Sequence, residues 1–394
     1  MIVDWRVMLG VVGVVWIGYV FAGYPLLLAA LAQLRRIRPI VREEDCPTVS
    51  VLISARNEEK DIEWKVRETL AWDYPPERLD IWVASDASED RTNEILEGIK
   101  DLRFHFVRME RRGGKNRALN RLAQSAEGDL FFFSDANSHV DAGCLRRMVR
   151  HFADQRVGCV TGNSNTRASE DEPSSGIAVY WGHEMLIRRL ENEFGSVLVC
   201  DGAIFCIRRA LYVPCIPELA NDLELPLRIG DAGYWLLHEP RAQVQEKETS
   251  SPWEEFSRRR RICAQGALGM WKLRGTLRGV RAWQFFSHKF LRWLLAIPLV
   301  LVLVSCLLLA GHTSFAVLLG MQVVFWGLAL VGLAATRYGE AAPKALSPLV
   351  YFLVSSAGAL LGVIDACMGR RFDLWESPLL TRGGQTAFGG EGDS

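Results

Sequence analysis

Uncharged stretches long enough to cross a membrane lie near both ends of the chain, and a charged segment lies between them. No charged side chain occurs from Val7 to Leu34, which exceeds the about 20 apolar residues that a membrane helix needs. A second stretch, from Trp293 to Thr336, is about twice that requirement, and Gly311-His312-Thr313-Ser314 interrupts it, which predicts two helices joined by a tight turn. A third stretch from Leu346 to Ile364 predicts a fourth span, with Gly358 and Gly362 spaced for close helix packing.

The charges that flank the first span predict its orientation. Only Asp4 and Arg6 precede it, whereas four arginines follow it: Arg35, Arg36, Arg38 and Arg42. Because basic residues accumulate on the cytoplasmic side of membrane helices, we expect an integral plasma (inner) membrane protein whose central segment is cytoplasmic. Four crossings would then place both termini outside, while Arg370 and Arg371, beside the last span, favour the opposite side for the tail.

The central segment alternates strand and helix patterns. Apolar runs predict strands over residues 48–54, 80–84, 104–109 and 129–133, with helical patterns between and after them. This rhythm is typical of an α/β domain with a mostly parallel sheet covered on both faces, so Phe131-Phe132-Phe133 is expected to be buried core. Asn57, Asp86 and Asp135 each follow a predicted strand, at the edge where ligands of such sheets collect.

Composition and short motifs argue against several function classes. The chain has 394 residues, is 49% hydrophobic and has a formal net charge of zero, which fits one globular domain plus several membrane helices and gives no argument for a nucleic-acid partner. Its nine cysteines include no CxxC pair, which is typical of reduced cytosolic thiols rather than of a zinc site. The chain has no GxxxxGK[ST] run, and no GxGxxG follows the first strand, which disfavours P-loop NTPases and dinucleotide dehydrogenases.

Asp135 and Asn137 suggest a cation site. A carboxylate followed two residues later by a second oxygen ligand, at the end of a strand, suits a hard divalent cation shared with a diphosphate. Taken singly, an acid at a strand end is more often a helix cap or a turn residue. Several acids at successive strand ends favour a binding site.

Several segments follow one another in the order seen in one enzyme family. They are VSVLISARNEEKDI, VASDASED, GGKNRALN, FFSDAN, GAIFCIRRALY, NDLELPLRIGDAGY and EEFSRRRRI. Over residues 47–275 the chain resembles membrane-bound family 2 glycosyltransferases, the group that contains cellulose, hyaluronan and chitooligosaccharide synthases. The resemblance implies a Rossmann-like GT-A fold, a nucleotide-diphosphate sugar donor with a UDP-sugar as first candidate, Mg²⁺ or Mn²⁺ as cofactor, and inversion at the anomeric carbon.

On the donor side, the resemblance assigns roles to four positions. Asn57, Glu58 and Asp86 match positions that hold the nucleoside, and Lys115 matches a donor-site lysine.

On the reaction side, Asp135 matches the first Asp of the family's DxD motif, which binds the metal and the diphosphate, and Asn137 stands at the second position. Asp222 matches the general base of the [ED]D pair, and Arg258 and Arg261 fall on the QxxRW motif near the diphosphate. In this arrangement a metal and fixed guanidinium groups stabilise the leaving diphosphate, while a carboxylate takes the proton of the acceptor hydroxyl.

The chain departs from the family pattern at four positions. Asn137 removes one negative charge from the metal site, which predicts lower metal affinity. Asn221 replaces the acid before the base, and Arg258 stands where Gln is usual. Ile262 stands where a Trp would stack beneath an acceptor sugar, so we expect a product that is short or built distributively.

Two further segments admit alternatives. Residues 177–194 have helical spacing, and a packed helix is favoured over an acceptor groove formed by Tyr180, Trp181 and Glu184. Residues 279–293 interleave basic and aromatic side chains directly before a span, which favours an amphipathic helix in the membrane interface over an RNA-binding patch. The Gly-rich end, residues 383–394, is expected to be disordered.

The sequence therefore predicts a membrane anchor (1–42), a GT-A domain (43–275), an interfacial helix (276–292), three membrane helices (293–368) and a tail (369–394). The expected reaction transfers a sugar to a saccharide or lipid-linked acceptor in polysaccharide or glycan synthesis, with export or assembly proteins as candidate partners. The alternatives are single addition to a glycolipid and a catalytically weakened scaffold subunit of a polysaccharide assembly.

Overall fold

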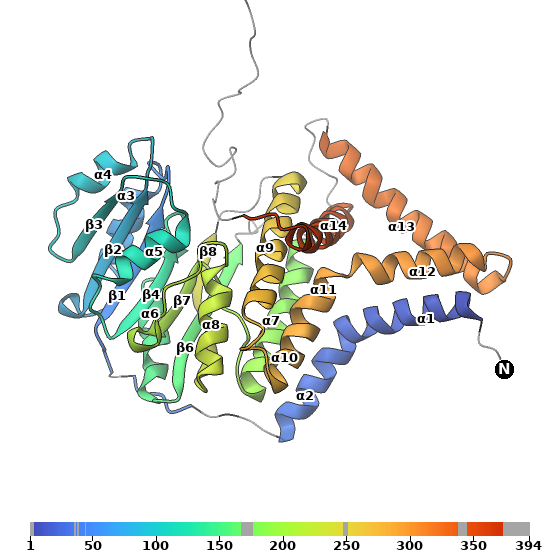
Figure 1. The fold of residues 1–394 in the computed structure, drawn as a ribbon, viewed down its shortest axis with the longest axis horizontal. Helices are drawn as coiled ribbons and strands as arrows, with labels where there is room; N and C mark the ends of the chain where they lie inside the picture. Colours follow the sequence, from blue (N-terminus) through green and yellow to red (C-terminus); the bar gives the residue numbers. More distant parts are fainter. Residues whose placement is uncertain are drawn as a thin grey trace, which may run out of the picture.

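A computed structural model describes residues 4–34, 37, 39–43, 45–166, 176–246, 251–337 and 345–372. The tail segment 383–394, predicted to be disordered, lies outside these residues. Figure 1 shows a sheet domain at the left, with α1, α12 and α13 extending away from it to the right and α7 and α9 lying in between.

One eight-stranded sheet forms the centre of the described chain, in the order β3-β2-β1-β4-β7-β6-β8-β5. Its strands are β1 Val49–Ala55, β2 Leu79–Asp86, β3 Phe104–Met109, β4 Leu130–Asp135, β5 His139–Val140, β6 Val157–Thr166, β7 Ile204–Arg208 and β8 Trp235–Glu246. The first four strands pair in parallel, as the alternating pattern predicts. The second half is mixed, because β7 runs antiparallel to both β4 and β6 while β6 and β8 are parallel.

Helices follow the strands of the first half in the expected alternation. The helices of the sheet domain are α3 Ile62–Leu70, α4 Thr92–Gly98, α5 Lys115–Ala123, α6 Cys144–Val149 and α8 Asn221–Asp231. Two longer helices, α7 Gly176–Phe194 and α9 Pro252–Lys272, lie between this domain and the apolar helices α1, α12 and α13 (Figure 1). The helix predicted for residues 177–194 is thus confirmed as α7.

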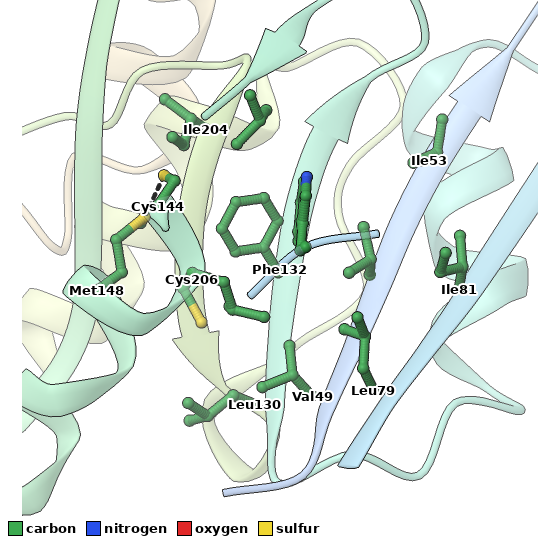
Figure 2. Packing of buried hydrophobic residues seen from close by; sticks show 14 of the residues in the cluster. Val49, Ile53, Leu79, Ile81, Leu130, Phe132, Cys144, Met148, Ile204 and Cys206 are labelled. Carbon is green, nitrogen blue, oxygen red and sulfur yellow. Dashed lines mark hydrogen bonds between the residues drawn. The ribbon is translucent and has the colours of Figure 1, made fainter. Parts of the chain in front are cut away.

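The core covers both faces of the sheet, because side chains of a strand point alternately to its two sides. Phe132 lies in the cluster shown in Figure 2, with Val49, Ile53 and Ile81 from neighbouring strands. Phe131 and Phe133 belong to the cluster on the opposite face, where Phe133 stacks on Phe205 at 4.5 Å between ring centroids. All three phenylalanines of β4 are buried, which confirms the prediction of a strand covered on both sides.

The apolar stretches form helices near the predicted positions. The first is α1 Trp5–Gly18, a π-turn Tyr19–Gly23 and α2 Tyr24–Leu34; the later ones are α12 Ala296–Leu308, α13 Thr313–Arg337 and α14 Ser347–Cys367. Among the described residues three helices are long and apolar enough to span a membrane: 5–34, 313–336 and 347–367. A fourth candidate is a bent pair, in which the segment 279–293 joins α12 at an angle of 58°. This segment is made of α10 Gly279–Gln284, a π-turn Phe285–Phe290 and α11 Leu291–Trp293.

Helix α14 packs along α9. A Cβ atom at Gly362 would clash with the Arg260 carbonyl oxygen, and one at Gly358 would lie 2.7 Å from the Phe256 carbonyl oxygen. The close packing predicted from the two glycines is therefore present, and its partner is the arginine-bearing helix of the sheet domain. In Figure 1, α14 is seen end-on, whereas α1 and α12 run across the view.

Candidate active site

The parallel strands bring the predicted polar residues to one edge of the sheet. In the register of the sheet, Ser54 of β1 pairs with Asp135 of β4, and Ala55 pairs with Ser85 of β2. The residues that follow these strands, among them Asn57, therefore lie side by side at the carboxyl ends of the strands, where α/β sheets bind ligands.

Asp86 joins two loops. Its carboxylate accepts hydrogen bonds from the backbone N–H groups of Gly113 and Gly114, at 2.6 and 2.8 Å, and the residue is 3% exposed. Gly114 has a φ of 84°, in the region that favours glycine, and α5 begins directly after it. The β2 end is thereby tied to the turn that presents Lys115.

Asn57 and Glu58 lie in the loop after β1. The Asn57 side-chain oxygen accepts from the Glu89 backbone N–H at 2.8 Å, and the Asn57 backbone N–H donates to the Ser88 hydroxyl at 3.1 Å. Glu58 is buried, and its backbone N–H donates to the Thr92 hydroxyl at 2.8 Å. Both residues thus hold the β1 and β2 loops together at the predicted nucleoside end.

Lys115 lies between two acids. Its ammonium donates to Asp135 Oδ1 at 2.6 Å and to the Gly202 carbonyl oxygen at 3.4 Å. Gly202 in turn lies against Asp222, because a Cβ atom at this glycine would meet Asp222 Oδ2 at 3.0 Å. The end of β4, the first turn of α5 and the start of α8 therefore converge on one lysine.

Burial raises the pKa of the Asp222 carboxyl above its ordinary value. The Lys115 ammonium opposes this effect, whereas the charges of Asp201 and Asp135 add to it. The Asp222 backbone carbonyl accepts from Cys200 N–H at 2.9 Å, which holds the start of α8 against the 200–203 turn. A carboxylate with a raised pKa binds a proton more strongly, which suits a general base.

The four arginines at positions 258–261 of α9 point in two directions, two of them toward α14 and the others toward the acids of the candidate site. Arg260 forms an ion pair with Asp365 of α14, with 3.0 Å between Nη2 and Oδ1, and Arg259 donates to the Tyr351 hydroxyl of the same helix. Arg261 faces the other way: burial and the nearby Arg258 lower its pKa, while Asp222 and Asp135 oppose that shift. Arg258 and Arg261 are three residues apart and therefore share a helix face near the two acids.

With this geometry in place, residues 50–213 match the family model Glycosyl transferase family 2. The chain carries a family 2 glycosyltransferase domain. The probable glycosyltransferase YdaM of Bacillus subtilis is 27% identical over 240 residues, which cover 57% of this chain and 56% of that protein. A beta-monoglucosyldiacylglycerol synthase of Synechocystis is 34% identical over 119 residues, which cover 29% of this chain and 25% of the synthase. The chain thus spans from a quarter to about half of the length of these relatives.

A solved structure shows the same fold over nearly the whole chain. The mannosyltransferase PcManGT from Pyrobaculum calidifontis, in complex with GDP-Man and Mn²⁺, has a TM-score of 0.70 at 20% identity, covering 92% of this chain and 99% of that chain. The glycosyltransferase domain therefore has the GT-A fold that the sequence predicts.

Asp135 and Asn137 fit a divalent cation in the glycosyltransferase domain. Asp135 lies at the end of β4 and is partly exposed, and Asn137 has no hydrogen-bond partner among the residues that the structure describes. One carboxylate and one amide oxygen leave most coordination positions for diphosphate oxygens and water, which is how Mg²⁺ is usually bound beside phosphates. Lys115 is bonded to Asp135 Oδ1, so the ion and the ammonium would share this carboxylate.

Some site residues were not singled out from the sequence. Gly202 begins the segment GAIFCIRRALY but received no role from the sequence, although its missing side chain makes room for Asp222. For Gly113 and Gly114 the sequence does contain a usable pattern, because two glycines before a helix indicate a turn with special backbone angles. Their bonds to Asp86, however, join residues 27 and 28 positions apart, and no local pattern predicts such a contact.

Glu184 lies in a buried ion cluster between α7 and the segment 279–293. Its carboxylate accepts from Lys289 at 2.8 Å and Arg292 at 2.7 Å and contacts His288 at 3.1 Å. This agrees with the packed-helix interpretation of α7, because the side chain joins that helix to the segment 279–293. The side chains of Tyr180 and Trp181 lie outside the described part of the chain.

Proposed function

We propose that the protein transfers a sugar, with inversion at the anomeric carbon, from a nucleoside-diphosphate sugar to a saccharide or lipid-linked acceptor at the membrane. The observation that carries the proposal is the position of Lys115, whose ammonium contacts Asp135 and the carbonyl oxygen of Gly202, a residue whose α-carbon lies against the Asp222 side chain. This geometry supports adjoining positions for a cation at the diphosphate and a carboxylate at the acceptor, as a single displacement requires.

Each side chain has one task in this reaction. Asp222 takes the proton of the acceptor hydroxyl as its oxygen attacks the anomeric carbon, and its raised pKa makes it a competent base. Lys115, Arg258 and Arg261 stabilise the negative charge that grows on the leaving diphosphate. No covalent intermediate is required, since the attack and the departure occur on opposite faces of the sugar.

A divalent cation, Mg²⁺ or Mn²⁺, would be held by Asp135 and Asn137. When bound, it supplies positive charge to the diphosphate and so makes that group a better leaving group. The neighbour PcManGT was solved with Mn²⁺ and GDP-Man, which supports a metal-dependent, nucleotide-sugar reaction for this fold. Asn57, Glu58 and Asp86 then form the nucleoside end of the donor site.

The helices that are long and apolar enough to span a membrane support a position at a lipid surface for this chemistry. Positive charges after the first span support a cytoplasmic domain in the plasma (inner) membrane, where soluble nucleotide sugars are the available donors. The acceptor would approach along α7 and α9, which lie between the sheet and the membrane helices (Figure 1). Export or assembly proteins would be the partners if the product is a polysaccharide.

Single addition to a lipid is the second candidate. Ile262 lies on α9 one residue beyond Arg261 and is 39% exposed, so this helix offers an aliphatic side chain where stacking on a sugar ring needs an aromatic one. A relative of the matching segment is named as a glycolipid synthase, in agreement with this candidate.

Donor turnover by the purified full-length protein in detergent tests the proposal. UDP- and GDP-sugars are supplied with Mn²⁺ or with EDTA, and hydrolysis and transfer are followed together with mass analysis of the lipid fraction. Metal-dependent release of nucleoside diphosphate is expected. Binding without any turnover would support the scaffold alternative instead, and a single added sugar would select the glycolipid candidate.

A further inference from the structure

Side chains of helix α3 contact residues 138–140, the segment that directly follows the proposed metal-binding residues. Trp64 packs on the His139 ring, with 3.6 Å between ring centroids. The Lys65 ammonium donates to the Ser138 carbonyl oxygen at 2.6 Å and to the Ser138 hydroxyl at 3.3 Å. Glu68 accepts from the Val140 backbone N–H at 3.3 Å. Three consecutive residues, 138–140, are therefore each held by one side chain of α3.

The contact at Ser138 reaches the turn that carries Asp135 and Asn137. The Ser138 hydroxyl donates to the Asp135 carbonyl oxygen at 2.9 Å and lies 3.2 Å from the Ser134 hydroxyl. The Ser138 backbone N–H also faces the Asp135 carbonyl, at 3.4 Å. This serine thus closes a four-residue turn, and Lys65 holds the serine.

Lys65 is unusual because it is a lysine in a fully buried position. It is 0% exposed, and a lysine is almost never fully buried unless it is paired. Its nearest acid is Glu68, with 3.8 Å between Nζ and Oε2. Burial lowers the pKa of Lys65 to about 8, while Glu68 and Asp135 favour its charged form. Because a buried ion pair is often no better for stability than apolar packing, stability alone does not account for this lysine.

The same helix also starts at the nucleoside end of the site. The backbone N–H groups of Asp61 and Ile62 donate to the Glu58 carbonyl oxygen, at 3.0 and 2.9 Å. One rigid element therefore joins the loop of Asn57 and Glu58 to the turn of Asp135 and Asn137.

We propose that Lys65, supported by Glu68, is a positioning residue that fixes the Asp135–Ser138 turn for the cation and the diphosphate of the donor. This rests on the proposed function, because it assigns a support to the metal-binding turn. Asn137 supplies an amide in place of a carboxylate, so the site has less charge with which to hold the ion and depends more on a preformed turn. A hydrogen-bonded ammonium at the carbonyl of Ser138 provides that rigidity.

The test compares Lys65→Met with Arg67→Met. Methionine has a length similar to lysine and suits a buried site, while Arg67 is an exposed residue of the same helix that pairs with Glu63 on the surface. Binding of UDP and GDP to the full-length protein is measured with and without Mn²⁺, together with the Mn²⁺ dependence of donor turnover. For Lys65→Met we expect a rise of about tenfold or more in the Mn²⁺ concentration for half-maximal turnover, metal-free nucleotide binding within about twofold of wild type, and no change for Arg67→Met.

Two results would overturn the proposal. A folded Lys65→Met protein with wild-type Mn²⁺ dependence removes the role of Lys65 and leaves the proposed function intact. A wild-type protein with no Mn²⁺-dependent nucleotide binding or turnover overturns both.

If Lys65→Met does not fold, Ser138→Ala serves instead, since it removes only the hydroxyl that links Lys65 to the Asp135 carbonyl. It should raise the Mn²⁺ requirement in the same direction, and an unchanged requirement would again count against the proposal.

Discussion

Asp222 is the residue whose surroundings most directly predict a measurable pH effect. Burial raises its pKa, so the deprotonated form that accepts a proton is lost as the pH falls through a value above the about 3.9 of a free Asp. Turnover at saturating donor should therefore decline on the acid side at a higher pH than an unperturbed aspartate would give.

Asp222→Asn should lower turnover by about 10²-fold or more with donor affinity nearly unchanged. Loss of donor binding with intact turnover of the bound donor would make Asp222 a binding residue.

Ile262 tests the nature of the product. An exposed isoleucine gives no flat face for a sugar ring, and aromatic contacts of this kind contribute about 1 kcal/mol. We expect the wild-type product to be short and Ile262→Trp to lengthen it, as judged by mass analysis. Long polymer from the wild-type protein at low acceptor turnover would show that another aromatic residue, such as Trp271, which is 67% exposed on the same helix, supplies the platform.

The position of several candidate site residues at one edge of the sheet could be predicted from the sequence, but most of their contacts could not. Apolar runs in the sequence show where the strands end. Because the strands are predicted to be parallel, Asp86 and Asp135 are expected at the same edge of the sheet. The role of Gly202 and the support of Ser138 by Lys65 depend on contacts between residues far apart in the chain, which no spacing encodes.

At the scale of elements, α14 packs on α9, the helix that carries the arginines proposed to act on the diphosphate. Gly362 leaves room for the Arg260 backbone, and Asp365 holds the Arg260 side chain from the same helix. Any side chain at position 362 must push α14 away from α9, and α9 also carries Arg258 and Arg261.

Gly362→Ala should therefore lower both stability and turnover. Overpacking of this kind costs about 1–3 kcal/mol, and the displacement would move the arginines relative to Asp135. Gly327→Ala in α13 is the matched control, since nothing lies within 4 Å of its added Cβ atom. Melting temperature and donor turnover in detergent give the two readouts, and equal values for the two variants would contradict this role for the contact.

The sequence predicts strands and helices where the hydrophobic pattern is local. It does not predict which strands pair when long segments separate them. The run from β1 to β4 alternates strands and helices at short spacing, which fixes parallel neighbours. The positions of β6, β7 and β8 depend on long connections, and the antiparallel β7 between β4 and β6 makes the second half of the sheet mixed rather than mostly parallel.

At the scale of the whole molecule, α14 bears on how many times the chain crosses the membrane. By length and composition it qualifies as a span, and four crossings would place both termini outside. Yet three of its polar side chains, Tyr351, Ser355 and Asp365, contact α9, and α14 runs across the direction of α1 and α12 in Figure 1.

We expect α14 to lie along the membrane surface on the side of the catalytic domain. The chain then crosses three times, through the segment 5–34, through the bent pair formed by residues 279–293 and α12, and through α13. Arg370 and Arg371 lie on the cytoplasmic side in this arrangement, in agreement with the positive-inside bias. A reporter fused after Ser394 should give a cytoplasmic signal. An external signal would show that α14 crosses as its composition alone suggests.

The central claim is that Asp135 and Asp222 serve the two halves of one metal-dependent sugar transfer. The most direct measurement is donor turnover by the full-length protein, across a Mn²⁺ titration, for wild type, Asp135→Ala and Asp222→Asn. We predict metal-dependent turnover for the wild type, loss of both turnover and metal-dependent nucleotide binding for Asp135→Ala, and loss of turnover with retained binding for Asp222→Asn. Wild-type turnover with full metal dependence in Asp135→Ala would contradict the account.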